Sequence, residues 1–453
     1  MRTTLHPRRA AIAMAAIGAL TLAGCGGDGG DEGGDEPSGG AKETTASVEL
    51  PKLDGQKLEV AAVWTGAEQD NFTKVLEEFE KRTGAEVAFV PTGNNTATFL
   101  QTKIQGGQPP DVGFLPQVGV LHQFADRGWL QPLGADAQAQ LDKNFSAGWK
   151  DLGAREGKQY GVYFKAANKS LVWYNAAAYE AAGITEEPKT WDDFLTTAQT
   201  LSDAGSPAVS VGGADGWTLT DWFENVYLSQ AGPEKYDQLA QHEIKWTDPS
   251  VKEALTTLAQ LWGKDELVAG GKSGALRTDF PKSVTQTFSG DTPAAMVYEG
   301  DFVAANINAD TDAKLGTDAK VFPFPAVGDE SPVVSGGDVA VALKKGEGAQ
   351  ALLTFLASTD AAEIWAGQGG FISPSKEVDT GAYKDDVTRD IAEALIAAGD
   401  DFRFDMSDQA PAAFGGTQGQ GEWKELQDFL KNPADVAGAQ AKLEAAAAKA
   451  YAG

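Results

Sequence analysis

The sequence predicts an α/β fold made of two lobes with a ligand cleft between them. One α/β unit with short apolar runs lies before residue 160, and a second one follows residue 175. Residues 160–175 (YGVYFKAANKSLVWYN) have the pattern of a strand that turn-forming residues interrupt. A strand that leaves one lobe, passes a polar break and enters another would connect two such units. A β-hairpin inside one domain has the same pattern, so these residues alone leave both interpretations open.

The first 24 residues have the pattern of a bacterial signal peptide and are excluded from the fold. Arginines near the start precede an apolar run, residues 10–23, that is too short to span a bilayer stably. The run ends in LAGC, which is similar to a lipobox with Cys25 as the lipidated residue. We therefore expect an extracytoplasmic protein that a lipidated Cys25 anchors to the outer face of the cytoplasmic membrane.

Residues 25–49 predict a flexible acidic, Gly-rich tether. They contain no aromatic side chain, and they bury too little apolar surface to offset the entropy of ordering. The folded part then starts near Leu50 and comprises roughly 400 residues, enough for two lobes with cores of their own.

Composition excludes several classes of function. Cys25 is the only cysteine of the chain, so the folded part has no disulfide, thiolate zinc site or cysteine nucleophile. A formal net charge of −28 argues against binding to nucleic acid, which requires a basic surface. The same charge would keep the folded part away from anionic head groups, which leaves the lipid as the only membrane contact.

A βαβ unit opens the folded part. Residues 57–65 (KLEVAAVWT) predict a buried strand because they are almost continuously apolar. Residues 70–82 predict an amphipathic helix, with apolar side chains at i, i+3, i+4 and i+7 from Phe72, and Gly84 would end it. Residues 86–90 predict the next strand.

Polar and aromatic side chains follow the strands of this unit, and such units bind ligands at the carboxyl ends of their strands. Trp64 and Glu68 come after the first strand, and Asn95 comes after the second. After a short helix, a Pro-Pro pair forces an extended entry to a third strand that Asp111 opens and Gln117 follows. We expect these five residues at a binding site.

The second unit begins after the interrupted strand, which itself carries Lys165. Residues 190–201 predict a helix that Thr190 caps, and residues 209–211 predict a short strand. Trp217 lies in the glycine-rich exit of that strand, just before a helix, and we expect it to contact ligand. Trp222 and Phe223, inside that helix, are expected in the core. Residues 249–262 predict a further helix.

The last third of the chain alternates strands and helices again. Strands are predicted at 294–297, before Glu299, at 321–325, and at 333–343, where Gly337 allows close approach of a ligand to the backbone beside Asp338. Helices are predicted at 349–357, 359–365, 423–430 and the alanine-rich C-terminus. Arg403 and Asp405 lie between aromatic residues, which suits a cleft edge or, equally, a solvated loop.

Several of these segments resemble, in this order, segments of the family 1 extracellular solute-binding proteins, the maltose-binding-protein-like components of carbohydrate ABC importers. The resemblance rests on PPDV from Pro109, FADRGWLQPL from Phe124, YGVYF…YN from Tyr160, AAMVYEG from Ala294, VVSGGDVAVAL from Val333 and GQGGFISPS from Gly367. The family's usual aromatic after the second crossing is replaced by Asp301-Phe302 in this chain.

The resemblance implies a periplasmic-binding-protein-like fold with three crossings between the lobes. It places residues 50–164 and 299–336 in an N-terminal lobe and residues 165–298 and 337–453 in a C-terminal lobe. It also implies a protein without enzymatic activity or cofactor, which captures a sugar by hinge closure and delivers it to the permease subunits of an ABC transporter. We expect a monomer.

The expected ligand-binding residues come from both lobes, and neither a catalytic nor a metal site is expected. Trp64, Glu68, Asn95, Asp111 and Gln117 are expected on one wall of the cleft, Lys165 and Trp217 on the other, and Glu299, Gly337, Asp338, Arg403 and Asp405 near the crossings. Two alternatives remain: a secreted glycoside hydrolase, which needs only a pair of carboxylates, and a binder of a non-sugar solute such as glycerol phosphate or a polyamine.

Overall fold

The structure is a computed structural model that describes residues 47–290, 294–398 and 402–452. The predicted signal peptide 1–24, Cys25 and nearly all of the predicted tether lie outside the described residues. Within the described ranges, no helix combines the length and the apolar character that crossing a membrane requires.

The first of two large sheets has six strands. Its order is β12-β11-β3-β1-β2, and β6 pairs with β11 as well. β1 is parallel to β2 and β3, whereas β11 is antiparallel to β3 and β6. The strands are β1 (Lys57–Ala62), β2 (Glu86–Pro91), β3 (Val112–Leu115), β6 (Gly161–Asn168), β11 (Val334–Ala342) and β12 (Arg403–Phe404).

Amphipathic helices cover the first sheet. In α1 (Gly66–Thr83) the apolar positions that begin at Phe72 are all buried, which confirms the predicted helix, although it starts four residues earlier than expected. The helix ends at Gly84, whose φ of 82° and N–H bond to the Glu80 carbonyl form the expected glycine stop. The other helices in this part are α2 (Thr96–Gln105), α3 (Val118–Asp126), α4 (Ala135–Asn144), α5 (Ala147–Leu152), α13 (Val303–Asp310), α14 (Glu347–Leu356), α15 (Thr359–Ala366) and α16 (Asp386–Ala398), with a small hairpin of β4 (Ala154–Arg155) and β5 (Lys158–Gln159).

The second sheet has four strands in the order β10-β7-β9-β8. They are β7 (Leu171–Asn175), β8 (Val209–Ser210), β9 (Met296–Tyr298) and β10 (Ala319–Pro323). The Thr190 side chain accepts a hydrogen bond from the Asp193 N–H and so caps α7 as predicted. The helices around this sheet are α6 (Ala176–Ala181), α7 (Trp191–Asp203), α8 (Trp217–Ala231), α9 (Pro233–Ala240), α10 (Pro249–Trp262), α11 (Gly271–Ala275), α12 (Phe280–Phe288), α17 (Met406–Gln409), α18 (Ala412–Gly415), α19 (Gly421–Lys431) and α20 (Val436–Tyr451).

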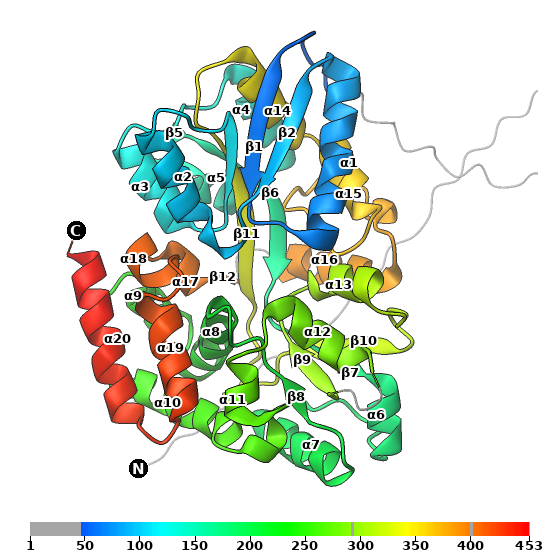
Figure 1. The fold of residues 1–453 in the computed structure, drawn as a ribbon, viewed down its shortest axis with the longest axis vertical. Coiled ribbons are helices and arrows are strands. Elements are labelled where there is room, and N and C mark those ends of the chain that lie inside the picture. The colour runs from blue at the N-terminus through cyan, green and yellow to red at the C-terminus, as the bar shows by residue number, and fades with distance from the viewer. Residues whose placement is uncertain (1–46, 291–293, 399–401, 453) are drawn as a thin grey trace, which may run out of the picture. The chain divides into compact units, whose positions relative to one another are not determined.

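The interrupted strand at residues 160–175 connects the two sheets. β6 belongs to the first sheet and β7 to the second, so the interpretation as a hairpin inside one domain is wrong. Figure 1 shows β6 and β11 running from the upper part of the folded body toward the lower part. Buried side chains hold the break: Asp301 accepts a hydrogen bond from the Asn168 N–H at 2.8 Å, and the Asn168 side chain accepts one from the Ser170 N–H at 3.0 Å.

The C-terminal third divides differently from the expected lobe boundaries. We expected residues 337–453 in the second lobe, whereas β11 lies in the first sheet, and α14 and α15 pack into the first core. The physical reason is that β11 is buried along its whole length between β6 on one side and β3 and β12 on the other. Helices α19 and α20 do pack into the second core.

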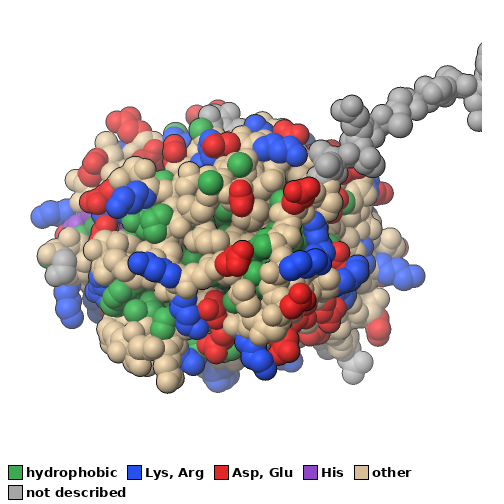
Figure 2. All heavy atoms as spheres, turned by 90° about the horizontal axis from the view of Figure 1, so that it is seen from above, with side chains coloured by type: hydrophobic (Ala, Val, Ile, Leu, Met, Phe, Trp, Pro, Cys, Tyr) green, Lys and Arg blue, Asp and Glu red, His purple; other side chains and the backbone are tan. Residues whose placement is uncertain are grey.

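Two aromatic clusters mark the two cores. Trp64 packs against Phe72, Phe114 and Trp365 in the first core, with ring centroids 4.7–4.8 Å apart. Trp222 lies 4.5 Å from Tyr298 in the second, which confirms its expected burial. On the face that Figure 2 shows, acidic and basic side chains are interspersed.

Candidate ligand-binding cavity

A cavity of about 360 Å³ is lined by elements of both sheets. The segments after β1, β2 and β3 contribute to it, as do β6 and β11 of the first sheet. The starts of α8 and α12 and the helices near the C-terminus contribute from the other side. Ligand sites in proteins commonly have volumes of a few hundred Å³ or more. Because the lining converges on the carboxyl ends of β1, β2 and β3, the cavity lies where α/β folds bind ligands.

The cavity brings together seven of the twelve residues expected at a site. These are Trp64, Glu68, Gln117, Lys165, Trp217, Gly337 and Asp338. Five residues do not line it: Asn95, Asp111, Glu299, Arg403 and Asp405.

Those five residues have other partners or positions. Asp111 accepts a hydrogen bond from the Glu59 N–H at 2.9 Å and pairs with Lys344, so it joins neighbouring strands. Arg403 pairs with Asp237 at 2.9 Å. Asn95 points to solvent, and its neighbour Asn94 lines the cavity instead. Glu299 and Asp405 are buried behind the lining.

Trp64 belongs as much to the core as to the cavity. Its side chain is only 2% exposed. The indole Nε1 donates a hydrogen bond to Asp338 Oδ2 at 3.1 Å, which links β1 to β11. Burial raises the pKa of Asp338 to about 6, although Lys165 nearby opposes this shift. The ring therefore orients a carboxylate toward the cavity and offers little of its own face.

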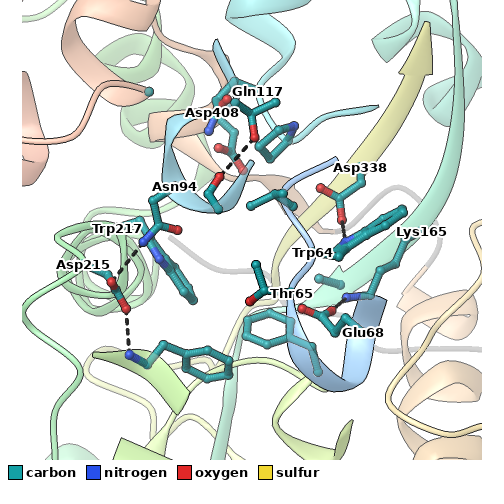
Figure 3. Close-up of a pocket in the computed structure, with 18 of the residues that line it drawn as sticks. Trp64, Thr65, Glu68, Asn94, Gln117, Lys165, Asp215, Trp217, Asp338 and Asp408 are labelled. Atoms are coloured by element: carbon teal, nitrogen blue, oxygen red, sulfur yellow. Dashed lines mark hydrogen bonds and ion pairs between the residues drawn. The ribbon is translucent and has the colours of Figure 1, made fainter. Parts of the chain in front are cut away.

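Lys165 forms an ion pair with Glu68 on the same side of the cavity. We expected these two residues on opposite walls. However, β6 places the ammonium beside the start of α1, and Figure 3 shows the pair next to Trp64 and Asp338. Burial opposes the charge of Lys165, but Glu68 and Asp338 raise its pKa above the usual value. The ammonium also lies 5.3 Å from the centroid of Phe302.

Trp217 lies on the other side of the cavity, as Figure 3 shows. It is the first residue of α8, and the glycine before it has a φ of 88°, which turns the chain into the helix. Its ring packs 5.4 Å from Phe280 and 6.0 Å from Phe302 but remains partly exposed. Trp217 is therefore placed to present an apolar surface to the cavity, whereas Trp222 is not.

A hydrogen bond crosses the cavity between Asn94 and Asp215. The Asn94 Nδ2 donates to Asp215 Oδ1 at 2.9 Å, and Asp215 Oδ2 accepts from the Phe280 N–H at 2.6 Å. Asn94 follows β2 of the first sheet, and Asp215 follows β8 of the second. The sequence did place Asn94, Asn95 and Thr96 at this strand end, but the cavity is lined by Asn94 and Thr96 and not by the Asn95 selected there.

Lys169 lies in the break between β6 and β7 and holds three carboxylates. Its ammonium is 3.2 Å from Asp221, 2.5 Å from Asp405 and 3.6 Å from Asp408, and it lies 5.8 Å from the centroid of Trp217. Burial opposes the charge of Lys169, but these carboxylates raise its pKa well above the usual value. Sequence analysis did not select this residue, and the only available signal was a lone cation in the polar break.

Further acidic groups are buried near the two lysines, Glu299 near Lys169 and Asp301 near Lys165. Burial raises the pKa of Glu299 to about 8 and that of Asp301 to about 7. Oxygens of Asp221, Glu224 and Asp405 lie within 4.8 Å of one another, a spacing that a metal ion can bridge. The ammonium of Lys169 already contacts Asp221 and Asp405, and so supplies the positive charge that this cluster needs.

Comparison with known proteins identifies relatives along most of the chain. Residues 65–363 match the family model of the bacterial extracellular solute-binding proteins. The chain is 34% identical to the osmoprotective compounds-binding protein GgtB of Synechocystis sp. over 386 residues, 83% of this chain and 89% of GgtB. It is 32% identical to the alpha-glucosides-binding periplasmic protein AglE of Rhizobium meliloti, over 85% of this chain and 86% of AglE.

Solved structures share the fold at lower identity. The solute receptor AcbH, described as having an exclusive preference for β-D-galactopyranose, superposes with a TM-score of 0.76 at 20% identity, over 87% of this chain and 99% of AcbH. A chitin oligosaccharide binding protein gives a TM-score of 0.74, also at 20% identity, over 88% of this chain and 99% of its own. These similarities establish the two-lobed fold of periplasmic solute-binding proteins that the sequence predicts.

Proposed function

The chain belongs to the bacterial extracellular solute-binding proteins, and from this membership we propose that it captures a sugar and delivers it to an ABC importer. The observation that carries the proposal is a cavity, lined from both sheets, in which a partly exposed Trp217 faces carboxylate and amide side chains. Aromatic faces pack on the C–H surfaces of sugar rings, and carboxylates and amides accept hydrogen bonds from hydroxyl groups.

Relatives support the class of ligand. AglE is named for alpha-glucosides and GgtB for osmoprotective compounds, and both cover most of this chain. A neutral glucoside or a similar polyhydroxylated solute is therefore the ligand we propose. The family consists of binding proteins located outside the cytoplasm and not of enzymes, so the alternative of a secreted glycoside hydrolase is not supported.

The proposed function includes delivery of the ligand to the importer and anchoring of the protein at the membrane. Ligand would stabilise a closed arrangement of the two lobes by contacts with both, and the permease subunits of the importer would recognise that form. The protein would act as a monomer, held at the membrane by a lipidated Cys25. The proposed binding residues are the seven expected residues that line the cavity, together with Asn94 and Asp408.

A thermal-shift screen against neutral mono- and disaccharides tests the proposal. A ligand that binds the folded state raises the melting temperature by mass action, so we expect one sugar of the panel to do so and to remain chemically intact. The variant Trp217→Ala should weaken binding of that sugar roughly 10- to 100-fold, about 1–3 kcal/mol.

Trp129→Ala is the matched control. Trp129 is also partly exposed and packs against Phe124 and Arg127, but it does not line the cavity. If no sugar shifts the melting temperature, the proposed function fails. If Trp217→Ala and Trp129→Ala change affinity equally, the cavity is not the binding site.

A further inference from the structure

Acidic side chains present carboxylate oxygens without a hydrogen-bond donor to the cavity. In three of the acidic side chains that line it, one oxygen has a partner. Glu68 contacts Lys165, Asp338 accepts a hydrogen bond from Trp64, and Asp408 contacts Lys169. The second oxygen of each has no hydrogen-bond donor among the described residues. Asp338 and Asp408 are only 9% and 6% exposed, so water reaches these oxygens mainly through the cavity.

The cations that line the cavity are already neutralised. Lys165 pairs with Glu68, and its side chain is only 4% exposed. Lys169 contacts three carboxylates. An anionic ligand would therefore have to compete with internal carboxylates for both ammonium groups. Neutral and cationic ligands face no such competition.

The Gln117 side chain offers unpaired amide groups to the cavity. Its side chain is 5% exposed, lines the cavity and has no hydrogen-bond partner among the described residues. A buried amide without a partner is destabilising unless water or ligand satisfies it. This observation points to a polar ligand independently of the acidic groups.

Two buried carboxyl groups, whose pKa values burial raises, also lie behind the lining. Neither oxygen of Glu299 or of Glu422 has a hydrogen-bond partner in the described part of the chain, and both side chains are fully buried. Ionisation of these groups would add to the negative potential in the cavity, and a bound cation would favour that ionisation. The carboxylates of Glu68 and Asp338 can compensate an ammonium group that enters the cavity, whereas no unpaired cation among the described residues of the lining compensates a carboxylate or phosphate.

We infer that the cavity discriminates between sugars by charge: it accepts neutral sugars, binds a sugar that carries an ammonium group more tightly, and rejects sugars that carry a carboxylate or phosphate. This inference rests on the proposed sugar-binding function. Glu68 and Asp338 would set the preference, with Glu68 the most accessible because its side chain is 21% exposed. The inference also separates the two non-sugar alternatives, since a phosphate ester would be rejected.

The test compares D-glucose, D-glucosamine and D-glucuronate by isothermal titration calorimetry at about pH 6.5, where the amine is protonated and the acid ionised. We expect glucosamine to bind at least about 10-fold more tightly than glucuronate, a difference of about 1.4 kcal/mol, with glucose between them. The difference should shrink as salt is added, although less than it would at an exposed site.

The variant Glu68→Gln sharpens the test because it releases Lys165. We expect it to reduce the preference for glucosamine and to strengthen glucuronate binding relative to the unmodified protein. Glu77→Gln is the matched control, since Glu77 lies on the same helix, is exposed and does not line the cavity. It should leave all three affinities unchanged.

The outcomes separate this inference from the proposed function. If glucose or glucosamine binds but glucuronate binds as tightly as glucosamine, the charge preference is refuted and sugar binding stands. If no sugar of the broader panel binds at all, both proposals fail. An unchanged preference in Glu68→Gln removes Glu68 from the explanation and contradicts the assigned origin of the selectivity.

Discussion

Lys165 and Lys169 are four positions apart in the chain, yet they have different environments. Lys165 makes one ion pair, with a glutamate that remains partly exposed to solvent. Lys169 contacts three carboxylates, two of them fully buried, and lies where β6 leaves the first sheet for β7 of the second. The comparison indicates that Lys165 belongs to the ligand surface, whereas Lys169 mainly holds the connection between the two sheets.

The largest expected effect is the loss of stability on replacing Lys169. Burial disfavours the charged form of Asp405, but Lys169 lowers its pKa to about 2, so this carboxylate remains ionised beside the ammonium. Lys169→Met leaves buried carboxylates uncompensated, and we expect it to cost about 3–5 kcal/mol of the free energy of unfolding near neutral pH.

Urea denaturation measures this effect, and Lys165→Met is the paired variant. Removing Lys165 leaves Glu68, which still reaches water, so a smaller loss is expected. Equal losses for the two variants would contradict the distinction between the two lysines. The loss in Lys169→Met should also diminish near pH 5, because the carboxylates left behind can then take up protons.

The second prediction concerns two buried acidic groups, Glu299 near Lys169 and Asp301 near Lys165. Glu299 and Asp301 have folded-state pKa values raised to about 8 and about 7, chiefly by burial. Between the unfolded and folded pKa values the native state binds more protons than the unfolded state, so stability falls as pH rises through this window. We expect the melting temperature to drop as the pH rises from the acidic range to about pH 8 and to level off above it, and the part of the drop between about pH 6.5 and about pH 8 is the range to measure.

The variant Glu299→Gln isolates one contribution to that drop. Both Glu299 oxygens lack a hydrogen-bond partner among the described residues, so the neutral amide removes the titration at almost the same volume. Its melting temperature should depend less on pH than that of the unmodified protein. His122, whose pKa burial lowers below 6.5, titrates beneath this window and does not obscure the result. A melting temperature that rises over the same range would refute the assignment.

The contrast between the two lysines also shows what sequence analysis can and cannot find. Lys165 follows apolar residues of a strand, and its position beside a predicted cleft made it a candidate. Lys169 contacts Asp221 and Asp405, which lie 52 and 236 positions away along the chain. No local pattern connects residues at such separations, so the cluster appears only after the chain has folded.

The fold was more predictable than the site because helices and strands carry local periodicity. The apolar spacing in α1 and the cap at Thr190 depend on neighbours within a turn or two. By contrast, the burial of Asp405 and the ion pairs of Asp111 and Arg403 depend on distant elements, and these three residues do not line the cavity. Polar residues at strand ends are necessary for such a site, but they do not identify it.

The smallest expected effect concerns Asn94, whose hydrogen bond to Asp215 crosses the cavity. Unlike the Lys169 cluster, this contact is half-buried, and Asp215 keeps its bond from the Phe280 N–H when it is lost. Asn94→Ala should therefore cost about 1 kcal/mol or less, and the cost should fall on the closed arrangement of the lobes. That corresponds to a shift of up to roughly five-fold toward the open form.

Small-angle scattering of the ligand-free protein measures that shift as a larger radius of gyration. Asn95→Ala is the matched control, because Asn95 is exposed, lies next to Asn94 and does not line the cavity. A similar radius of gyration for both variants would show that the hydrogen bond does not hold the two sides together. If Asn94→Ala instead lowers the melting temperature as much as Lys169→Met does, the hydrogen bond stabilises the fold itself. The proposed contrast between a rigid crossing at Lys169 and a weak contact across the cavity is then wrong.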